Sequence, residues 1–210
     1  MKFFQSSFSP NSRRVRIFLA EKGITIPTEL VDLGAKAQFS DAYRAINSRF
    51  VVPTLVLDDG TSIGEVLAIW RYLEETHPKF PLLGLTAKDK ALVTMWERRA
   101  ELDGFAAVME AVRNTLPVLK VRALASPHNY EQIPPLAERS VLRARNFYAD
   151  LNSRLAEVPF VAGDAFSAAD ITAVVTVDFA RTGINLPIPE EHASLRRWYD
   201  TVSARPSAKA

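Results

Sequence analysis

The hydrophobic pattern of this 210-residue chain changes once, near residue 80, and that change limits the folds open to it. Before it, short β-like runs alternate with helical runs. From about residue 86 onward, apolar residues recur at helical spacing and strand-like alternation disappears. Residues 77–85 (HPKFPLLGL) carry two prolines and a glycine, which is typical of a linker. We therefore predict an α/β domain over residues 1–80 and an all-helical domain over residues 86–210.

The first domain is expected to have the order β-α-β-α-β-β-α. Its predicted strands are residues 2–6, 28–33, 54–57 and 61–63, and its predicted helices are residues 11–22, 40–46 and 65–75. Gly23 stands where a helix C-cap belongs and Ser40 where an N-cap belongs. In the second domain, helices are expected near residues 86–116, 132–156, 168–181 and 190–204. Ser167 and Asp170 have the spacing of a capping box.

Composition excludes several classes of function. The absence of cysteine removes disulfides, a thiolate nucleophile and a CxxC redox pair. A net charge of +2 gives no reason to expect a nucleic-acid or membrane partner, and no stretch approaches 18 apolar residues. None of the three histidines has metal-ligand spacing, so no metal is expected. The start of the chain is unlike a secretory signal, and we predict a cytoplasmic location.

Pro53 stands at the start of a predicted strand, where proline is tolerated. A trans Val52–Pro53 bond would merely begin the strand. A cis bond would turn the chain and point the backbone N–H and C=O of Val52 outward, where an extended peptide pairs with them as an added strand. Only about 5–6% of such bonds are cis in folded proteins, so the surrounding element order is what favours cis here.

Glu65 lies at the start of the helix expected over residues 65–75. The free N–H groups of a helix N-terminus hold a carboxylate, while a glutamate side chain accepts an ammonium. The two together would recognise an α-amino acid end group. The alternative for Glu65 taken alone is that it complements the helix dipole.

Ser9 precedes the helix expected over residues 11–22, where its hydroxyl either caps that helix or donates to an anion. In a chain without cysteine, the anion of interest is a thiolate supplied by a ligand. Lowering a thiol pKa by about two units takes roughly 2.7 kcal/mol. One charged hydrogen bond of about 1.5–3 kcal/mol and the helix terminus together supply it. Arg13, Arg14 and Arg16 are either a solvated face or a mild field for an anionic ligand.

These segments, in this order, resemble the thioredoxin-like domain of cytosolic glutathione S-transferases. The matching phrases are Ser9-Pro10 followed by RRVRIFLAEKGI, then VVPTLVLDDG and GEVLAIWRYLEE. In the second half, MWERRAEL, FVAGDAFSAADITAV and LRRWYDTVSARPS resemble that superfamily's helical domain. The resemblance covers essentially the whole chain and is nearest to bacterial and fungal members of the serine type, with a zeta-like QFS segment at residues 38–40. It implies a βαβαββα thioredoxin-like domain followed by an all-α domain.

The resemblance also implies a glutathione site. Ser9 matches the hydroxyl that contacts the glutathione sulfur in serine-type members, with Ser7 and Asn11 as neighbours that would substitute for it. The remaining matches are Gln38 on the glycine end of the tripeptide, Val52 as backbone partner of its cysteinyl unit, Pro53 as the cis-proline and Glu65 as the γ-glutamyl anchor.

Two departures from the family pattern concern this site. The usual Glu-Ser pair reads Glu65-Val66, so a hydroxyl donor is missing while the Val66 backbone N–H stays. Loss of that donor weakens binding by about 1.5–3 kcal/mol. The usual Asn-Pro-x-Gly loop before the cis-proline reads Asn47-Ser48-Arg49-Phe50, which is bulkier and reshapes the rim of the pocket.

The expected function is that of an enzyme, a glutathione S-transferase that activates the thiol of reduced glutathione for attack on a small hydrophobic electrophile. Glutathione is the co-substrate, and a homodimer is implied by the resemblance. The expected electrophile pocket is lined by Phe105, Val108, Met109, Val112 and Arg113. The alternatives are a non-catalytic binding or scaffold protein of the same fold and a glutathione-dependent isomerase or lyase.

Overall fold

The computed structural model describes all residues from 1 to 210, and the chain divides into two compact units. The first comprises residues 1–80 with residues 125–128 and residue 210. The second comprises residues 81–124 and 129–209.

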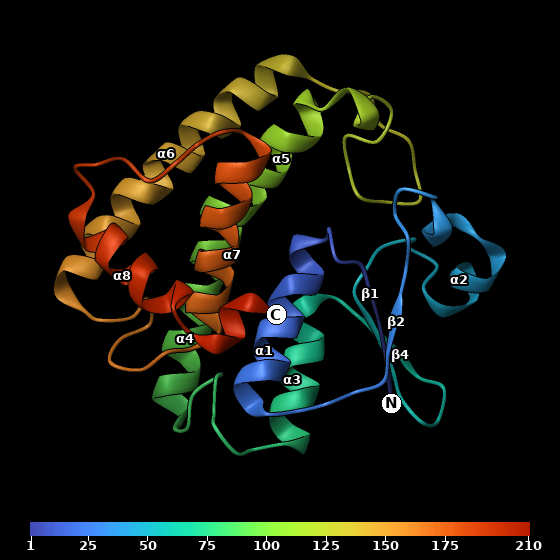
Figure 1. Ribbon diagram of the computed structural model, residues 1–210, viewed down its shortest axis with the longest axis horizontal. Coiled ribbons are helices and arrows are strands. Elements are labelled where there is room, and N and C mark those ends of the chain that lie inside the picture. Colours follow the sequence, from blue (N-terminus) through green and yellow to red (C-terminus); the bar gives the residue numbers. More distant parts are fainter. The chain divides into compact units, whose positions relative to one another are not determined.

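The first unit is built on a four-stranded sheet in the order β2-β1-β3-β4 (Figure 1). Its strands are β1 (Lys2–Gln5), β2 (Thr28–Leu30), β3 (Thr54–Val56) and β4 (Ser62–Gly64). β1 runs parallel to β2 and antiparallel to β3, and β4 is antiparallel to β3. The helices are α1 (Pro10–Lys22), the 3-10 turn η1 (Ala37–Phe39), α2 (Asp41–Ile46) and α3 (Val66–Thr76). This sequence of elements confirms the predicted β-α-β-α-β-β-α order.

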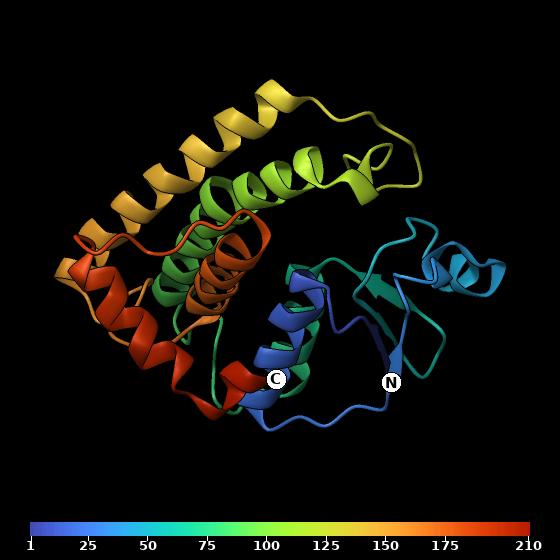
Figure 2. The same cartoon turned by 45° about the horizontal axis from the view of Figure 1, so that its top comes forward.

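The sheet lies between α2 on one face and α1 with α3 on the other (Figures 1 and 2). Successive side chains of a strand point to opposite faces, so neighbouring residues of β1 serve both layers. Phe4 joins a buried cluster with Tyr43 of α2 and with Val52. Phe3 is also buried, and by alternation it faces α1 and α3.

β2 differs from its prediction. The alternation over residues 28–33 indicated a half-buried strand, yet the strand ends at Leu30 and its three residues are all exposed. β2 is the edge strand of the sheet, so only one of its sides is covered by a neighbouring strand. Val31, just beyond the strand, is the first buried residue of this segment.

The second unit is helical, as expected. It contains α4 (Ala87–Arg99), a π-helical segment η2 (Ala100–Phe105), α5 (Ala106–Thr115), the 3-10 turn η3 (Pro117–Leu119), α6 (Pro134–Glu157), α7 (Ala168–Gly183), α8 (Ala193–Ser203) and the 3-10 turn η4 (Pro206–Lys209). Figure 2 shows α5 and α6 side by side, and α7 is the most completely buried helix of this unit.

The single helix expected over residues 86–116 is interrupted by the π-helical segment. Gly104 lies in that segment, and a Cβ placed there would lie 2.7 Å from Cε1 of Phe147 in α6. The chain therefore allows α6 to approach closely only where a side chain is missing. A π-helical turn changes the hydrogen-bond pattern from i→i+4 to i→i+5 only locally, inside a run that stays helical, so a helical pattern over residues 86–116 predicts the run without this interruption.

The predicted caps are confirmed. Gly23 ends α1 in the left-handed conformation, with φ 64°. Ser40 precedes α2 and its Oγ accepts the N–H of Tyr43. Asp170 accepts the backbone N–H of Ser167 at 3.0 Å in the capping box of α7.

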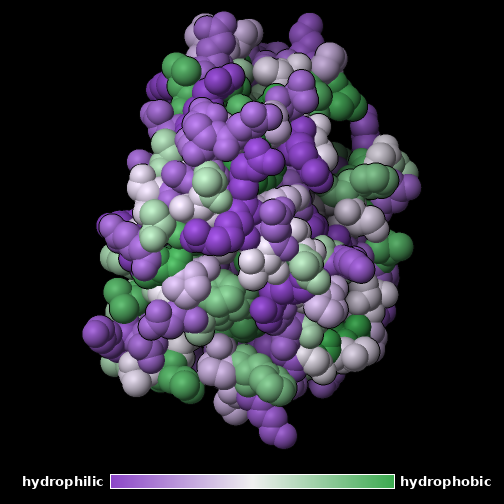
Figure 3. All heavy atoms as spheres, turned by 60° about the vertical axis from the view of Figure 1, so that its left-hand side comes forward, coloured by the Kyte–Doolittle hydropathy of each residue, from purple (hydrophilic) through white to green (hydrophobic).

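None of the helices combines the length and the apolar character that crossing a membrane requires. On the face drawn in Figure 3, hydrophilic and hydrophobic residues are interspersed, and the hydrophobic ones form small groups. Scattered apolar side chains of this kind are normal on a protein surface.

Candidate functional site

The strand register brings several loops to one edge of the sheet. Phe4 of β1 pairs with Thr54 of β3, and Thr54 pairs with Gly64 of β4. Gln5 of β1 pairs with Leu30 of β2. The segments that leave this edge are therefore residues 6–9 after β1, 31–40 after β2, 51–53 before β3 and 65 before α3. Ser9, Gln38, Val52, Pro53 and Glu65 all lie in these segments.

The Val52–Pro53 peptide bond is cis, which confirms the predicted conformation. No hydrogen bond is formed within the chain by the backbone N–H or C=O of Val52. Val52 lies two residues before Thr54, the first residue of β3, and its side chain packs in the buried cluster with Phe4 and Tyr43. A backbone with both groups unpaired beside a strand is what an extended peptide needs for added-strand pairing.

A small polar network holds the segment before Pro53 in place. The Tyr43 hydroxyl donates to the Val51 carbonyl at 2.7 Å, and Asn47 Nδ2 donates to the same carbonyl at 3.1 Å and to Thr54 Oγ1 at 2.8 Å. Burial raises the pKa of Tyr43, so it stays a neutral hydrogen-bond donor. No role was predicted for Tyr43 or Thr54, whereas Asn47 belongs to the loop at residues 47–50 that departs from the family pattern.

Glu65 lies one position before α3 and does not occupy its first turn. Its φ of 64° is in the left-handed region, which is uncommon for a residue with a side chain. The side chain is exposed and makes no capping bond to α3. The Glu65 carboxylate is thus open to an outside partner, and no side chain caps the first N–H groups of α3. The backbone conformation of Glu65 is one that clusters at functional sites.

Ser9 caps α1. Its Oγ accepts the N–H of Ser12 at 3.2 Å, and the residue is 8% exposed. Because the hydroxyl only accepts in this bond, its own proton is free to be donated. Of the two neighbours considered in its place, Ser7 is exposed, and Asn11 Oδ1 accepts from Arg14 Nη1 at 3.2 Å.

Gln38 lies in η1, and its buried Oε1 has no hydrogen-bond partner within the chain. The ring of Phe39 packs against that of Phe50, with 5.6 Å between their centroids. This contact joins the segment of Gln38 to the segment of Val52. Phe50 has φ 56° and thus a left-handed conformation that the family loop usually gives to glycine.

The five residues expected to line an electrophile pocket are not equivalent. Phe105, Val108 and Val112 are buried inside the helical unit. Val112 packs so closely that a Cβ on Gly183 would lie 2.6 Å from its Cγ2. Met109 and Arg113 are half-buried. Within this unit, only Met109 and Arg113 of the five are therefore partly exposed, while the other three are packed in the core.

Arg113 is held by the loop that follows α5. Its Nη2 donates to the Arg122 carbonyl at 2.5 Å. Burial and, to a smaller extent, the nearby charge of Arg122 lower its pKa. The side chain is thus fixed in one orientation.

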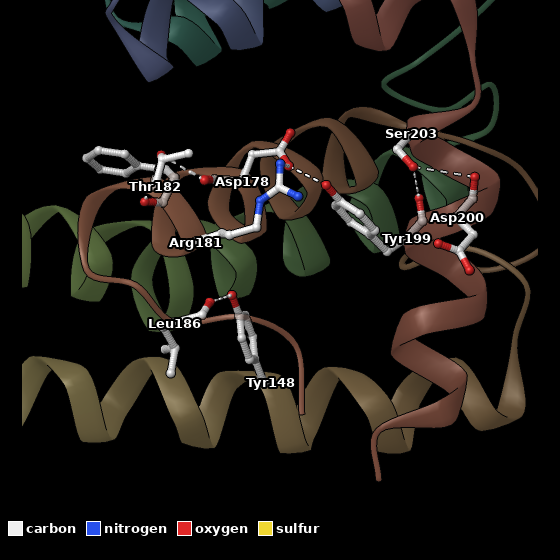
Figure 4. Close-up of polar contacts among 9 residues, drawn as sticks. Tyr148, Asp178, Arg181, Thr182, Leu186, Tyr199, Asp200 and Ser203 are labelled. Carbon is white, nitrogen blue, oxygen red and sulfur yellow. Dashed lines mark hydrogen bonds and ion pairs between the residues drawn. The ribbon is translucent and has the colours of Figure 1, made fainter. Parts of the chain in front are cut away.

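The helical unit also contains titratable groups that no predicted role involves (Figure 4). Tyr199 donates to Asp178 Oδ1 at 2.5 Å, and the buried Tyr148 donates to the Leu186 carbonyl at 3.2 Å. Burial, assisted by the charge of Asp178, raises the pKa of Tyr148. The first bond joins α8 to α7, and the second joins α6 to the segment that follows α7.

A cavity of about 260 Å³ lies within the helical unit, between α4, η2 and α6. Trp96 on its wall is flanked by two guanidinium groups, Arg99 at 4.8 Å and Arg154 at 4.5 Å from the ring centroid. Asp103 and Asp150 line the same cavity. It contains none of the predicted site residues and offers charges of both signs, so the candidate site is assigned to the sheet edge of the first unit.

Comparison with known proteins agrees with the fold described above. Residues 3–81 match the model of the glutathione S-transferase N-terminal domain, and residues 134–201 match that of the C-terminal domain. The chain is 33% identical over 211 residues to glutathione S-transferase 2 of Saccharomyces cerevisiae, covering all of this chain and 88% of the relative. It is 43% identical over 96 residues to maleylacetoacetate isomerase of Rattus norvegicus, covering 44% and 42% of the two chains.

Solved structures agree as well. A glutathione S-transferase domain-containing protein of Marinobacter aquaeolei VT8 superposes with a TM-score of 0.90 at 35% identity, over 99% of both chains. A thioredoxin-like sheet domain followed by a helical domain is the fold that this class of protein shares. The chain belongs to the glutathione S-transferase family.

Proposed function

We propose that this chain is a glutathione-conjugating enzyme that binds reduced glutathione at the sheet edge formed by the loops of Ser9, Gln38, Val52 and Glu65. The observation that carries the proposal is the free backbone of Val52 beside the cis-Pro53, at the entrance of β3. A tripeptide in extended conformation would pair its cysteinyl unit with that backbone as an added strand.

The two ends of the tripeptide would be recognised by different elements. The γ-glutamyl ammonium would bind the exposed carboxylate of Glu65, and its carboxylate would accept from the first N–H groups of α3, including that of Val66. The buried Oε1 of Gln38 lacks a partner and would accept an N–H from the glycine end. The site thus complements a zwitterionic peptide end group.

The thiol would then lie at the N-terminus of α1. There the Ser9 hydroxyl would donate to the sulfur, and the helix terminus would add a favourable field. The S–H proton would leave to water, and the thiolate would attack the electrophilic carbon, forming an S–C bond while the leaving group departs with its electron pair. The protein would contribute proximity and stabilisation of the anion, with the electrophile near Met109 and Arg113.

Thiolate absorbance of bound glutathione, followed against pH, tests the proposal. We expect Ser9→Ala to raise the apparent thiol pKa by about one to two units, because a hydrogen bond to the charged form is lost. Ser7→Ala is the matched control and should leave this pKa unchanged, since Ser7 is exposed. If the thiol pKa in Ser9→Ala stays at the wild-type value, whether or not Ser7→Ala shifts it, Ser9 has no part in the mechanism.

A glutathione-dependent isomerase is a second candidate, because the 96-residue match to a maleylacetoacetate isomerase is 43% identical, against 33% for the longer match to the yeast glutathione S-transferase. The two activities differ in what happens to glutathione. A conjugating enzyme consumes one thiol per turnover, whereas an isomerase regenerates it. Titration of free thiol during turnover of an electrophile and of a cis-olefinic diketo acid therefore separates them.

A non-catalytic binding protein is the third candidate, and Val66 and the altered loop at residues 47–50 are what favour it. Calorimetry at millimolar glutathione distinguishes a lost site, which gives no binding heat, from a weakened one. A protein that binds glutathione but turns over neither substrate type would support the scaffold role.

We also propose a cytoplasmic homodimer, as is typical of the family. Sedimentation equilibrium provides the check, because a dimer has twice the mass of the 23.4 kDa chain. A mass of one chain at micromolar concentration would contradict it.

A further inference from the structure

A ring of hydrogen bonds holds the turn between β1 and α1. The N–H of Ser9 donates to the Ser6 carbonyl at 3.1 Å, and the N–H of Ser12 donates to Ser9 Oγ at 3.2 Å. The N–H of Ser6 completes the ring by donating to Ser12 Oγ at 3.2 Å. Ser12 is fully buried, and its backbone N–H therefore holds Ser9 Oγ in a defined position.

Arg16, one turn further along α1, is bonded to this ring. Its Nη1 donates to Gln5 Oε1 at 2.6 Å and to the Ser6 carbonyl oxygen at 3.3 Å. The Ser6 carbonyl therefore accepts from both the Arg16 guanidinium and the Ser9 N–H. This single carbonyl therefore links the guanidinium of Arg16 to the backbone of Ser9.

We propose that Arg16 is a positioning residue for thiol activation, an inference that rests on the proposed glutathione function. By holding the Ser6 carbonyl it fixes the turn that aims the Ser9 hydroxyl, and its charge favours an anion held beside Ser9. A half-buried guanidinium bonded to Gln5 and Ser6 is less screened by water and salt than an exposed one. The role thus differs from that of a solvated basic face.

Several other charged groups lie near the proposed position of the thiol and belong to its electrostatic surroundings together with Arg16. The other charged residues on α1 and in or beside the segments that meet at this edge include Arg13, Arg14, Asp32, Lys36, Arg49 and Glu65. Asp32 Oδ1 is occupied by the N–H groups of Gly34 and Ala35. Burial, and then the charge of Arg13, lower the pKa of Arg16, but a guanidinium stays charged at any pH at which a thiol titrates.

The thiol pKa of bound glutathione in Arg16→Gln, Arg16→Lys and Arg71→Gln tests the proposal. Arg71 is an exposed arginine of α3, bonded to Glu75, so its replacement removes the same charge from the same unit without touching the turn. We expect Arg16→Gln to raise the thiol pKa by about one unit, a roughly tenfold loss of thiolate well below that pKa. Arg16→Lys should recover most of this loss, and Arg71→Gln should have no effect.

Binding of S-methylglutathione, which has no thiol to ionise, is the second readout. Its Kd in Arg16→Gln should stay within about threefold of the wild-type value, because a charge that acts on the sulfur has nothing to act on. Comparable weakening of this Kd in both Arg16 variants would mean a merely structural role and would overturn the inference. An unchanged thiol pKa in Arg16→Gln would overturn it as well.

The outcomes also separate this inference from the proposed function. Wild-type protein that fails to bind S-methylglutathione contradicts the glutathione site itself. Wild-type protein that binds it while Arg16→Gln keeps the wild-type thiol pKa contradicts the role of Arg16 alone. If Arg16→Gln does not fold, Gln5→Leu decides in its place. This variant removes one of the two acceptors that hold the Arg16 guanidinium, so it should raise the thiol pKa, and an unchanged thiol pKa would overturn the role.

Discussion

Val66, the first residue of α3, is one of the two places at which the candidate site departs from its family pattern. We predict that Val66→Thr, which replaces a methyl with a hydroxyl, tightens glutathione binding by about tenfold by restoring a donor to the γ-glutamyl carboxylate. Calorimetry checks this. Val66→Ala is the control without a hydroxyl and should bind no more tightly than wild type. Equal affinity of the Thr and Ala variants would contradict the prediction.

Asn47 is a second single residue on which the candidate site depends, because it holds the backbone next to Val52. Its amide bonds the Val51 carbonyl and Thr54 Oγ1, so Asn47→Ala should loosen the segment that presents Val52. We expect loss of about 1–3 kcal/mol in the free energy of unfolding and weaker glutathione binding. Denaturant titration and calorimetry measure the two effects. Unchanged affinity in a folded variant would show that the network serves stability only.

Among the elements, α7 depends on a single buried carboxylate at its start. Asp170 accepts from Val161, Trp198 and Ser167, and burial raises its pKa from 3.8 to about 6 against these bonds. The native state therefore takes up a proton at a higher pH than the unfolded state. The contribution of Asp170 to stability accordingly increases as pH falls from 7 towards 4, by up to about 3 kcal/mol.

Asp170→Asn removes this titration and should cost about 1–3 kcal/mol at pH 7, because the amide cannot accept all the bonds. The difference in unfolding free energy, wild type minus variant, should grow as the pH is lowered. Urea titrations at pH 7, 5.5 and 4 measure it. A difference that shrinks with falling pH would contradict the raised pKa.

Lys22 joins the C-terminal end of α1 to the C-terminal end of α3. Its fully buried Nζ contacts Glu74 at 2.6 Å and donates to the carbonyls of Lys79 and Phe80 at 2.9 and 3.2 Å. We predict that Lys22→Met destabilises the protein by about 3–5 kcal/mol, because Glu74 and two carbonyls lose their cation. Lys22→Met combined with Glu74→Leu should recover part of the loss. Equal instability of the single and double variants would contradict the ion-pair explanation.

For the whole molecule, the decisive fact of composition is that it has no cysteine. Any thiol chemistry must use sulfur from a ligand. We expect pretreatment with iodoacetamide, removed before assay, to leave glutathione-dependent turnover unchanged. Inactivation under these conditions would mean that another side chain is essential and reactive.

The order of elements followed from local signals, because Gly23, Ser40 and the Ser167–Asp170 pair mark helix ends through contacts a few residues long. The π-helical turn and the exposure of β2 did not follow from such signals. Phe147 lies against Gly104 of that turn, and β2 is the edge strand, and both relations involve residues far apart in the sequence. Val108 likewise has helical spacing in sequence, and only packing shows that it is buried.

Residue types and their spacing by themselves determined the two-part architecture and the lack of an intrinsic thiol, and the resemblance to a known family added the positions at which a peptide ligand is expected to bind. Tertiary structure decided which of those positions share one sheet edge and left the Val52 backbone unpaired. It also bonded Arg16 to the carbonyl that Ser9 uses. The physical reason is range: caps and periodicity act within one turn, whereas strand register and buried hydrogen bonds join residues that the sequence keeps far apart.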